Sequence, residues 1–261
     1  MPPDRRRLDS TALWNTLAGL PAADYDAALR HLMAVLCAAL RADNATWVAA
    51  VRMARGHAAR RDGQLGWRGR AVRQLHATPQ RDALVREALR GQDSGPALTT
   101  QALMRTAGSF RVHRLRDGFV DLEAFRATAH YRAFHQAVGL RDRLWAVLPV
   151  NADCESCLLF DTYAPRRRFS TRDAQTVADT LAGSVWFHRR LLLSHGLLLA
   201  DKPLSPSQHK LLRLLLSERS EAGIARELGL TRATTHTYIT GLYRHLGINS
   251  RAGLMALWLQ N

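Results

Sequence analysis

The sequence predicts an α+β domain followed by an all-helical domain of four helices. Residues 1–195 mix helical apolar periodicity with short strand-like runs, whereas residues 202–261 have helical periodicity only. Between these regions, residues 201–206 contain two prolines, which disfavour helix at the residues before them. A chain of 261 residues is long enough for two modest domains. We therefore expect an N-terminal tail or helix over residues 1–23, an α+β domain over 24–199 and the helical domain over 200–261.

In the first region, helical and strand-like segments alternate in a way that is typical of α+β domains. The predicted helices have apolar residues on one face, and they cover residues 24–41, 79–90, 121–138 and 171–193. The predicted strands form two hairpins, 45–53 with 66–76 and 143–150 with 156–163. Residues 91–96 are expected to be a loop. Ser170 should cap the last helix, with Asp173 nearly completing a capping box.

The helical domain has a start and a stop signal at almost every helix. The predicted helices cover residues 205–216, 221–228, 231–245 and 251–259. Ser220, Thr231 and Ser250 are capping residues, and Gly229 makes a tight turn between the second and third helices. Two short helices joined by such a turn are typical of the helix-turn-helix arrangement. The small core should consist of Leu211, Leu212, Leu215, Ile224, Ala225, Leu228, Leu230, Ile239, Leu242, Leu246 and Leu254.

The composition is that of a soluble globular protein, with 47% hydrophobic and 23% charged residues. The longest apolar stretch, 191–200, is interrupted by polar residues and is shorter than the roughly 20 residues of a membrane span. The arginines at 5–7 are followed by polar residues rather than by the apolar core of a signal peptide. An odd number of cysteines, three, indicates no disulfide framework. We therefore expect a cytoplasmic protein with no membrane partner.

The charge is strongly basic, with 37 Lys and Arg against 22 Asp and Glu, a formal net charge of +15. The only lysines are Lys202 and Lys210, so the first region contains no phosphate-binding P-loop and no Schiff-base lysine, and it does not resemble a phosphate-accepting receiver domain. The excess is spread over the chain, with 29 basic and 18 acidic residues up to residue 200 and 8 and 4 after it. Such a charge attracts polyanions, but net charge alone does not identify the partner.

Two sequence stretches carry a specific resemblance. Residues 224–234 read IARELGLTRAT, residues 242–251 read LYRHLGINSR, and Leu-Ser-Pro stands at 204–206. Together they resemble the LuxR-type (GerE-like) helix-turn-helix of bacterial transcription regulators over nearly all of residues 204–259. The chain departs from the usual glutamate, valine, histidine and lysine of that family at Gln208, Thr235, Tyr238 and His245.

The resemblance implies binding to double-stranded DNA through the third helix of the domain. His236, Thr237 and Thr240 occupy the positions that contact bases, and Thr231, Arg232 and Thr234 lie at the helix N-terminus, where phosphates bind. Thr235 is a further short donor on this helix, and Arg244 and Arg251 are expected to contact the flanking backbone. The alternative is a helical interaction module that does not touch DNA.

The first region resembles, more faintly, the GAF-like sensor domains that precede such modules. The resemblance lies in Gly66-Trp67-Arg68, in a helix followed by a hairpin, and in residues 169–173. The residue pattern of an acyl-homoserine-lactone receptor is not recognisable. Aromatic side chains usually line a sensor pocket, and the candidates are Trp47, Trp67, Phe119, Tyr131, Phe134 and Trp145. The alternative for each is an ordinary core residue.

Cys154 and Cys157 form the one Cys-x-x-Cys pair. As a zinc site the pair lacks two ligands, because Cys37 is distant in sequence and His188 or His195 would need the fold to bring them near. A redox switch is the other functional interpretation. The pair is predicted at a hairpin turn, away from any helix N-terminus, so we expect two incidental cysteines. We expect no metal and no cofactor. No metal-ligand spacing is recognisable among His31, His57, His76, His113, His130 and His135.

These observations predict a one-component transcription regulator, with an N-terminal sensor domain for a small molecule or a partner. Met255, Trp258 and Leu259 are expected to form an exposed apolar patch on the last helix, and the resembling family uses this helix for its two-fold contact, so we expect a homodimer. The predicted helix 171–193 would add a second contact. The alternative is a protein-interaction adaptor that binds no ligand. No enzyme is expected, because no catalytic constellation is recognisable.

Overall fold

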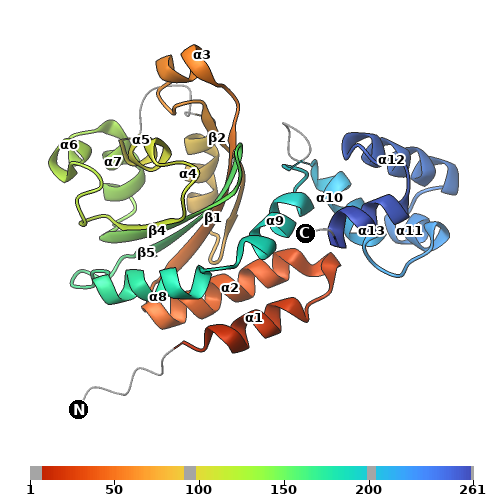
Figure 1. Ribbon diagram of the computed structural model, residues 1–261, viewed down its shortest axis with the longest axis horizontal. Coiled ribbons are helices and arrows are strands. Elements are labelled where there is room, and N and C mark those ends of the chain that lie inside the picture. The colour runs from red at the N-terminus through yellow and green to blue at the C-terminus, as the bar shows by residue number, and fades with distance from the viewer. Residues whose placement is uncertain (1–7, 91–97, 199–203, 260–261) are drawn as a thin grey trace.

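The computed structural model describes residues 8–90, 98–198 and 204–259, and it has the two parts that the sequence predicts (Figure 1). The first part is a five-stranded antiparallel sheet with helices, and the second is a four-helix module. The α+β and all-helical classes are confirmed, and the finer GAF-like class stays a prediction. The arginines at 5–7, the loop 91–96 and most of the predicted boundary at 201–206 lie outside the described residues. No helix of the described chain is long and apolar enough to cross a membrane.

The sheet has the strand order β2-β1-β5-β4-β3. Its strands are β1 (Asn44–Arg52), β2 (Trp67–Gln74), β3 (Arg111–Arg114), β4 (Asp142–Asn151) and β5 (Cys154–Thr162). Both predicted hairpins, β1-β2 and β4-β5, are confirmed. The pairing of β1 with β5 joins them, with Val48 opposite Cys157. Cys154 therefore begins a strand, and the prediction that this pair lies in the turn is wrong.

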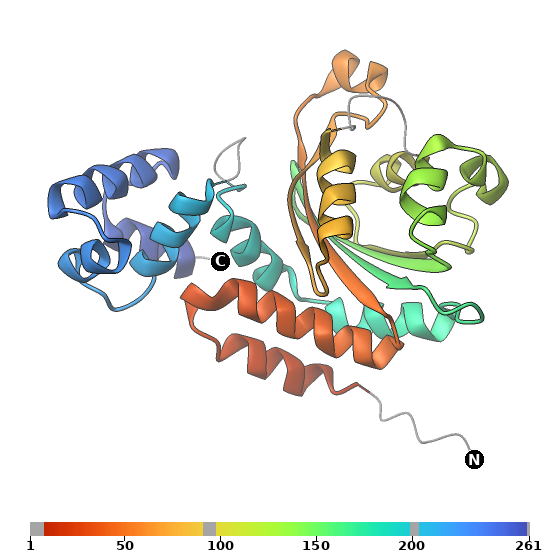
Figure 2. The same ribbon diagram turned by 180° about the vertical axis from the view of Figure 1, so that it is seen from behind.

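One face of the sheet is covered by helices from both ends of the first region. They are α1 (Ser10–Ala18), the short 3-10 turn η1 (Ala22–Asp24), α2 (Tyr25–Leu40), α8 (Thr171–Leu181) and α9 (Val185–Ser194). Figure 2 shows α2 between the sheet and α1. Trp47 is fully buried on this face, and its indole Nε1 donates a hydrogen bond to Ser156 Oγ at 2.7 Å.

The opposite face carries a second, smaller core around Trp67, Phe125 and Trp145. The segments near this face or at its rim are short: α3 (Gly56–Arg61), α4 (Pro79–Arg90), α5 (Leu98–Arg105), α6 (Leu122–Arg126), α7 (Ala129–Tyr131) and the π-helical turn η3 (Arg132–Gln136). Helix α5 and strand β3 had no counterpart among the predicted elements.

Two predicted long helices are broken, and each break has a local cause. In the segment 121–138, the Thr128 side chain accepts a hydrogen bond from the Tyr131 N–H and starts a new helix after α6. In the segment 171–193, Gly183 adopts a left-handed φ of 76° between α8 and α9. The long helix that was expected to support a dimer is therefore absent from the described residues.

The C-terminal module follows its predicted boundaries closely. Its helices are α10 (Pro206–Leu215), α11 (Glu221–Leu228), α12 (Arg232–His245) and α13 (Arg251–Leu259). Ser205 and Gln208 form a capping box at α10, and Ser220 and Thr231 cap α11 and α12. All the predicted core residues are buried except Leu228 and Leu230, which are half-buried.

The module packs directly on the first region through α10 and α13 (Figure 1), and one apolar core runs through both. Trp258 on α13 is only 3% exposed, and its ring lies 5.4 Å from that of Tyr25 on α2. Arg213 on α10 donates from Nε to the Ala23 carbonyl at 2.9 Å. The expectation of an exposed Trp258 is therefore wrong, because the protein's own α2 covers it. Met255 is half-buried, and Leu259 is exposed.

Candidate nucleic-acid interface

Helices α11 and α12 form a helix-turn-helix. Gly229 ends α11 in the left-handed conformation, with φ 66°, and its N–H contacts carbonyls in the last turn of that helix. Two residues later the Thr231 side chain accepts a hydrogen bond from the Thr234 N–H and starts α12. The left-handed Gly229, followed two residues later by the capping Thr231, sets the turn between the two helices.

Helix α12 divides cleanly into a buried and an exposed side. Thr235, Ile239 and Leu242 are buried, which is the spacing of one helix face. Within α12, the exposed positions that the sequence predicts for DNA binding are Arg232, His236, Thr237, Thr240 and Arg244. These five side chains contain no acid, and they leave a donor-rich surface of the length that a major groove accepts.

Thr235 is the first exception among the predicted contacts. Its side chain is fully buried, and its Oγ1 donates to the Thr231 carbonyl at 2.9 Å. The Thr235 side chain thus packs in the core of the module, and its hydroxyl is satisfied by a hydrogen bond within the helix. The prediction that Thr235 contacts DNA is therefore wrong.

Arg251 is the second exception. Its Nε donates to the Leu215 carbonyl at 2.9 Å, and its two terminal nitrogens donate to the carbonyls of Arg219 and Ser217. The guanidinium thus binds the chain where α10 ends and the link to α11 begins. These bonds use donors that a phosphate contact would need, so Arg251 has a structural role instead.

Thr231 and Thr234 are partly engaged with each other. Their hydroxyls are 2.9 Å apart, in addition to the capping bond from the Thr234 N–H. Thr231 is exposed and Thr234 half-buried at the N-terminus of α12. This end of the helix carries the positive end of the helix dipole, which favours an anion.

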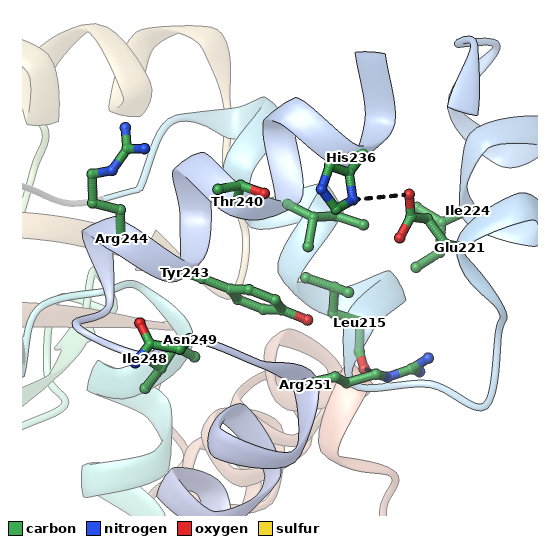
Figure 3. Close-up of a pocket in the computed structure, with 11 residues that line it drawn as sticks. Leu215, Glu221, Ile224, His236, Thr240, Tyr243, Arg244, Ile248, Asn249 and Arg251 are labelled. Carbon is green, nitrogen blue, oxygen red and sulfur yellow. Dashed lines mark hydrogen bonds and ion pairs between the residues drawn. The ribbon is translucent and has the colours of Figure 1, made fainter. Parts of the chain in front are cut away.

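His236 has an acidic neighbour. Its Nδ1 lies 3.4 Å from an oxygen of Glu221 on α11, and its side chain is 70% exposed. Figure 3 shows Thr240 between His236 and Arg244 along α12, with the Glu221 carboxylate facing the imidazole. A polar contact this exposed is weak, so His236 stays available to contact a base.

Tyr238 is a further exposed residue of α12, at a position where the sequence departs from the usual histidine of the LuxR-type family. It is 52% exposed, which is unusual for a large aromatic side chain on a structured helix. The sequence signal was its place on α12, two residues after His236. Tyr238 is therefore an additional candidate contact, with a ring for a methyl group or sugar and a hydroxyl for a phosphate.

The first region has a separate cavity on the face of the sheet away from the module. Its volume is about 610 Å³, within the range of small-molecule sites, and Trp67, Phe134 and Trp145 are among the residues that line it. Trp47 lies on the other face and is a core residue. Tyr131 and Phe119 are not among the lining residues, and they pack beside the cavity on His135 and Trp145 respectively.

His130, which is not one of the aromatic candidates from the sequence, lines this cavity as well. Burial lowers the pKa of His130 to about 4, with the Arg143 charge as a second cause, so its imidazole is neutral at pH 7. The lining of the cavity is mostly apolar, and its polar groups include the neutral His130, Glu87 and Arg68.

The two cysteines of the Cys-x-x-Cys pair lie on opposite faces of the sheet. Cys154 belongs to the large core and Cys157 to the small one, because residues three apart in a strand point in opposite directions. Burial raises their pKa to about 11 and about 12, and all three cysteines are free. The pair therefore does not offer two thiolates to one ion, which supports the interpretation as incidental residues.

The turn, the caps and the exposed third helix define the C-terminal module as a helix-turn-helix domain. Residues 202–257 match the family model described as GerE, bacterial regulatory proteins, luxR family. This module is therefore a LuxR-family domain. No curated protein matches the chain.

Among solved structures, the chain is similar to the VqsR LBD domain from Pseudomonas aeruginosa, with 15% identity and TM-score 0.48 over 69% of this chain and 95% of that one. It is also similar to SdiA in complex with octanoyl-rac-glycerol, with 12% identity and TM-score 0.49 over 95% and 91%. Escherichia coli SdiA gives 13% identity and TM-score 0.44 over 96% and 95%. Similarity at this level is too low to assign the first region to a fold family or to a ligand.

Proposed function

We propose that this protein is a transcription regulator that binds double-stranded DNA through α12, under the control of its N-terminal domain. The observation that carries the proposal is the exposed, acid-free row of side chains on α12 within a LuxR-family domain. His236, Thr237 and Thr240 contact base edges, and Arg232 and Arg244 contact phosphates.

The docked arrangement of the module supports the control by the N-terminal domain. Helices α10 and α13 pack on η1 and α2, while the reading side chains of α12 stay exposed. A change in the first region that moves α2 therefore moves the whole module. Control acts on how the module is held and paired, because the reading surface itself is not covered by the described part of the first region.

The cavity beside Trp67 and Trp145 supports a small molecule as the controlling signal. Strand β5 links the cavity to the module: Cys157 lines the cavity on one face, and on the other face the Cys154 thiol lies 3.4 Å from the Leu197 carbonyl, close to the start of the module. A ligand that shifts β5 would therefore change both the cavity wall at Cys157 and the contact between Cys154 and Leu197. Native mass spectrometry of the purified chain tests this: a copurified small molecule that is lost in Ala133→Phe, which fills the cavity, supports the role, and an empty cavity in both contradicts it.

We also propose that the DNA-bound form is a two-fold homodimer on a palindromic site, with two α12 helices about one DNA turn apart. If α13 makes the two-fold contact, as the family resemblance implies, Trp258 has to leave Tyr25 first. The docked structure is then the form with weaker DNA binding.

The test is DNA binding by the full chain. Selection from fragmented genomic DNA at low salt, followed by fluorescence anisotropy, should recover a preferred sequence. Arg244→Ala should weaken binding, and Arg226→Ala, at an exposed arginine on α11 that is not among the predicted DNA contacts, should change it little. Failure of both the full chain and Tyr25→Ala to bind any DNA would contradict the proposal and favour the protein-interaction adaptor.

A further inference from the structure

Three ionisable side chains meet where the module docks on the first region. Asp26 comes from the first turn of α2, His195 from the end of α9 and His209 from α10. The ligand atoms of all three lie within 4.8 Å of one another. His195 Nε2 is 4.0 Å from Asp26 Oδ1, and His209 Nδ1 is 3.8 Å from Asp26 Oδ2.

The proton of His195 can be assigned from its partners. Its Nδ1 lies 2.9 Å from the Leu191 carbonyl, which can only accept, so Nδ1 carries the hydrogen. The other nitrogen, Nε2, therefore has a lone pair. It is buried in a side chain that is 4% exposed, and it has no hydrogen-bond partner among the described residues. A histidine held by a backbone carbonyl through one nitrogen, with the other nitrogen free, has the arrangement of a metal ligand.

The lone pair of His195 faces a carboxylate, and two acceptors do not bind each other without a cation between them. Arg73 and Arg213 are the positive charges near the cluster. Arg73 Nε lies 3.4 Å from Asp26 Oδ1, whereas Asp26 Oδ2 faces His209 Nδ1 at 3.8 Å.

We propose that Asp26, His195 and His209 bind one divalent transition-metal ion of the Zn²⁺ class. Two imidazoles and one carboxylate are ligands that this class of ion prefers, and a solvent molecule would complete a tetrahedral site. Bonds of about 2.1 Å in a tetrahedron place ligand atoms about 3.4 Å apart, so the cluster needs to contract by no more than about 1.4 Å. The solvent-facing Asp26 and His209 give the ion an entry path, since both are only partly buried.

The site bridges the two parts of the chain. Asp26 and His195 belong to the first region and His209 to the LuxR-family domain, so the bound ion fixes α10 against α2 and α9. Beside this site, the backbone at Gly196 also packs tightly against Leu204. A Cβ added to Gly196 would lie 2.8 Å from Leu204 Cγ. The metal site does not depend on the proposed DNA binding, and only its effect on regulation rests on that function.

The test uses the full chain without a histidine tag, treated with a chelator and then equilibrated with Zn²⁺ alone. Elemental analysis should give one ion per chain, and the melting temperature should rise with Zn²⁺, because the ion binds the folded state. Co²⁺ in place of Zn²⁺ should produce visible absorption bands of a site with nitrogen and oxygen ligands. The controls exclude adventitious binding: His57→Gln changes an exposed histidine on α3 and should keep the ion.

His209→Gln and Asp26→Asn should each lower Zn²⁺ affinity by at least about tenfold and abolish the Zn²⁺-dependent rise in melting temperature. Both side chains are only partly buried, so these variants should keep the circular dichroism of the parent chain. A chain that binds no Zn²⁺, or a His209→Gln variant that binds it as tightly as the parent, would overturn the proposal. DNA binding is measured on the same samples. A chain that binds DNA but no Zn²⁺ contradicts the metal site alone, and a chain that binds Zn²⁺ but no DNA contradicts the proposed function alone.

Discussion

Tyr25, the first residue of α2, and Trp258, on the last helix α13, pack edge to face. Their ring centroids are 5.4 Å apart, and the ring planes meet at 79°. Trp258 is buried by this contact, and Tyr25 also stacks on Phe187 of α9, at 5.7 Å. An aromatic pair of this geometry contributes about 0.5–1.5 kcal/mol beyond the area that it buries. The contact thus ties the orientation of the LuxR-family domain to the core of the first region.

Tyr25→Ala should loosen this docking. We expect faster proteolysis between α9 and α10 and at least severalfold tighter DNA binding, because α13 is released for pairing. Limited proteolysis and fluorescence anisotropy measure the two effects. Tyr163→Ala, a change at a half-buried tyrosine just after β5, is the control and should alter neither. Unchanged proteolysis and unchanged DNA binding in Tyr25→Ala would show that this contact does not restrain the module.

Sequence reading should depend on His236 and Thr237. Replacing either by alanine should reduce discrimination between the preferred site and other DNA by about 1–3 kcal/mol, because one base contact is lost. Arg244→Ala should instead weaken all sequences similarly and reduce the salt slope by about one unit. Binding isotherms at several salt concentrations separate the two patterns. A uniform loss in His236→Ala would mean that this histidine contacts the backbone only.

Arg251→Ala should destabilise the module without a specific effect on DNA reading. The variant removes the guanidinium that hydrogen-bonds the carbonyls of Leu215, Ser217 and Arg219, and we expect a loss of about 2–3 kcal/mol in the free energy of unfolding. Urea denaturation measures this loss. Arg226→Ala is the matched control, an exposed arginine in the same module that should cost little. Equal stability of the two variants would contradict the structural role of Arg251.

The cysteines should be unreactive in the folded protein. Burial raises the pKa of Cys154 to about 11 and the pKa values of Cys37 and Cys157 to about 12, so at pH 8 at most about a thousandth of each thiol is ionised. Iodoacetamide at pH 8 should label them only after unfolding, as peptide mass spectrometry would show. The double variant Cys154→Ser and Cys157→Ser should leave the response of DNA binding to oxidant unchanged. Rapid labelling of the native chain, or an oxidant response that the double variant abolishes, would revive the redox interpretation.

The C-terminal module could be predicted almost completely from the sequence, because its signals are local. Ser205, Ser220 and Thr231 cap the helices that follow them, and Gly229 takes the left-handed turn that only a residue without a Cβ adopts easily. The apolar spacing of α12 also gave the buried side correctly at Ile239 and Leu242. It did not reveal that Thr235 lies on this side, because a threonine in the core satisfies its hydroxyl within the helix.

The first region could be predicted only in part. Both hairpins followed from alternation and turn residues, but the broken helices depend on Thr128 and Gly183, whose local bonds and backbone conformation compete with an otherwise helical pattern. The division of aromatic residues between the two faces of the sheet depends on strand register. Trp47 and Trp67 lie on neighbouring strands, yet one fills the large core and the other lines the cavity.

The sequence by itself therefore determined the identity of the module and the residues available on its reading helix, because caps, turns and helical periodicity act over a few residues. Only the tertiary structure decided where Trp258 packs, what Arg251 binds and which three residues meet at Asp26, His195 and His209. Each of these contacts joins segments far apart in the chain. Their positions follow from how α2, α9, α10 and α13 pack around one core, and periodicity within any single segment carries no information about that packing.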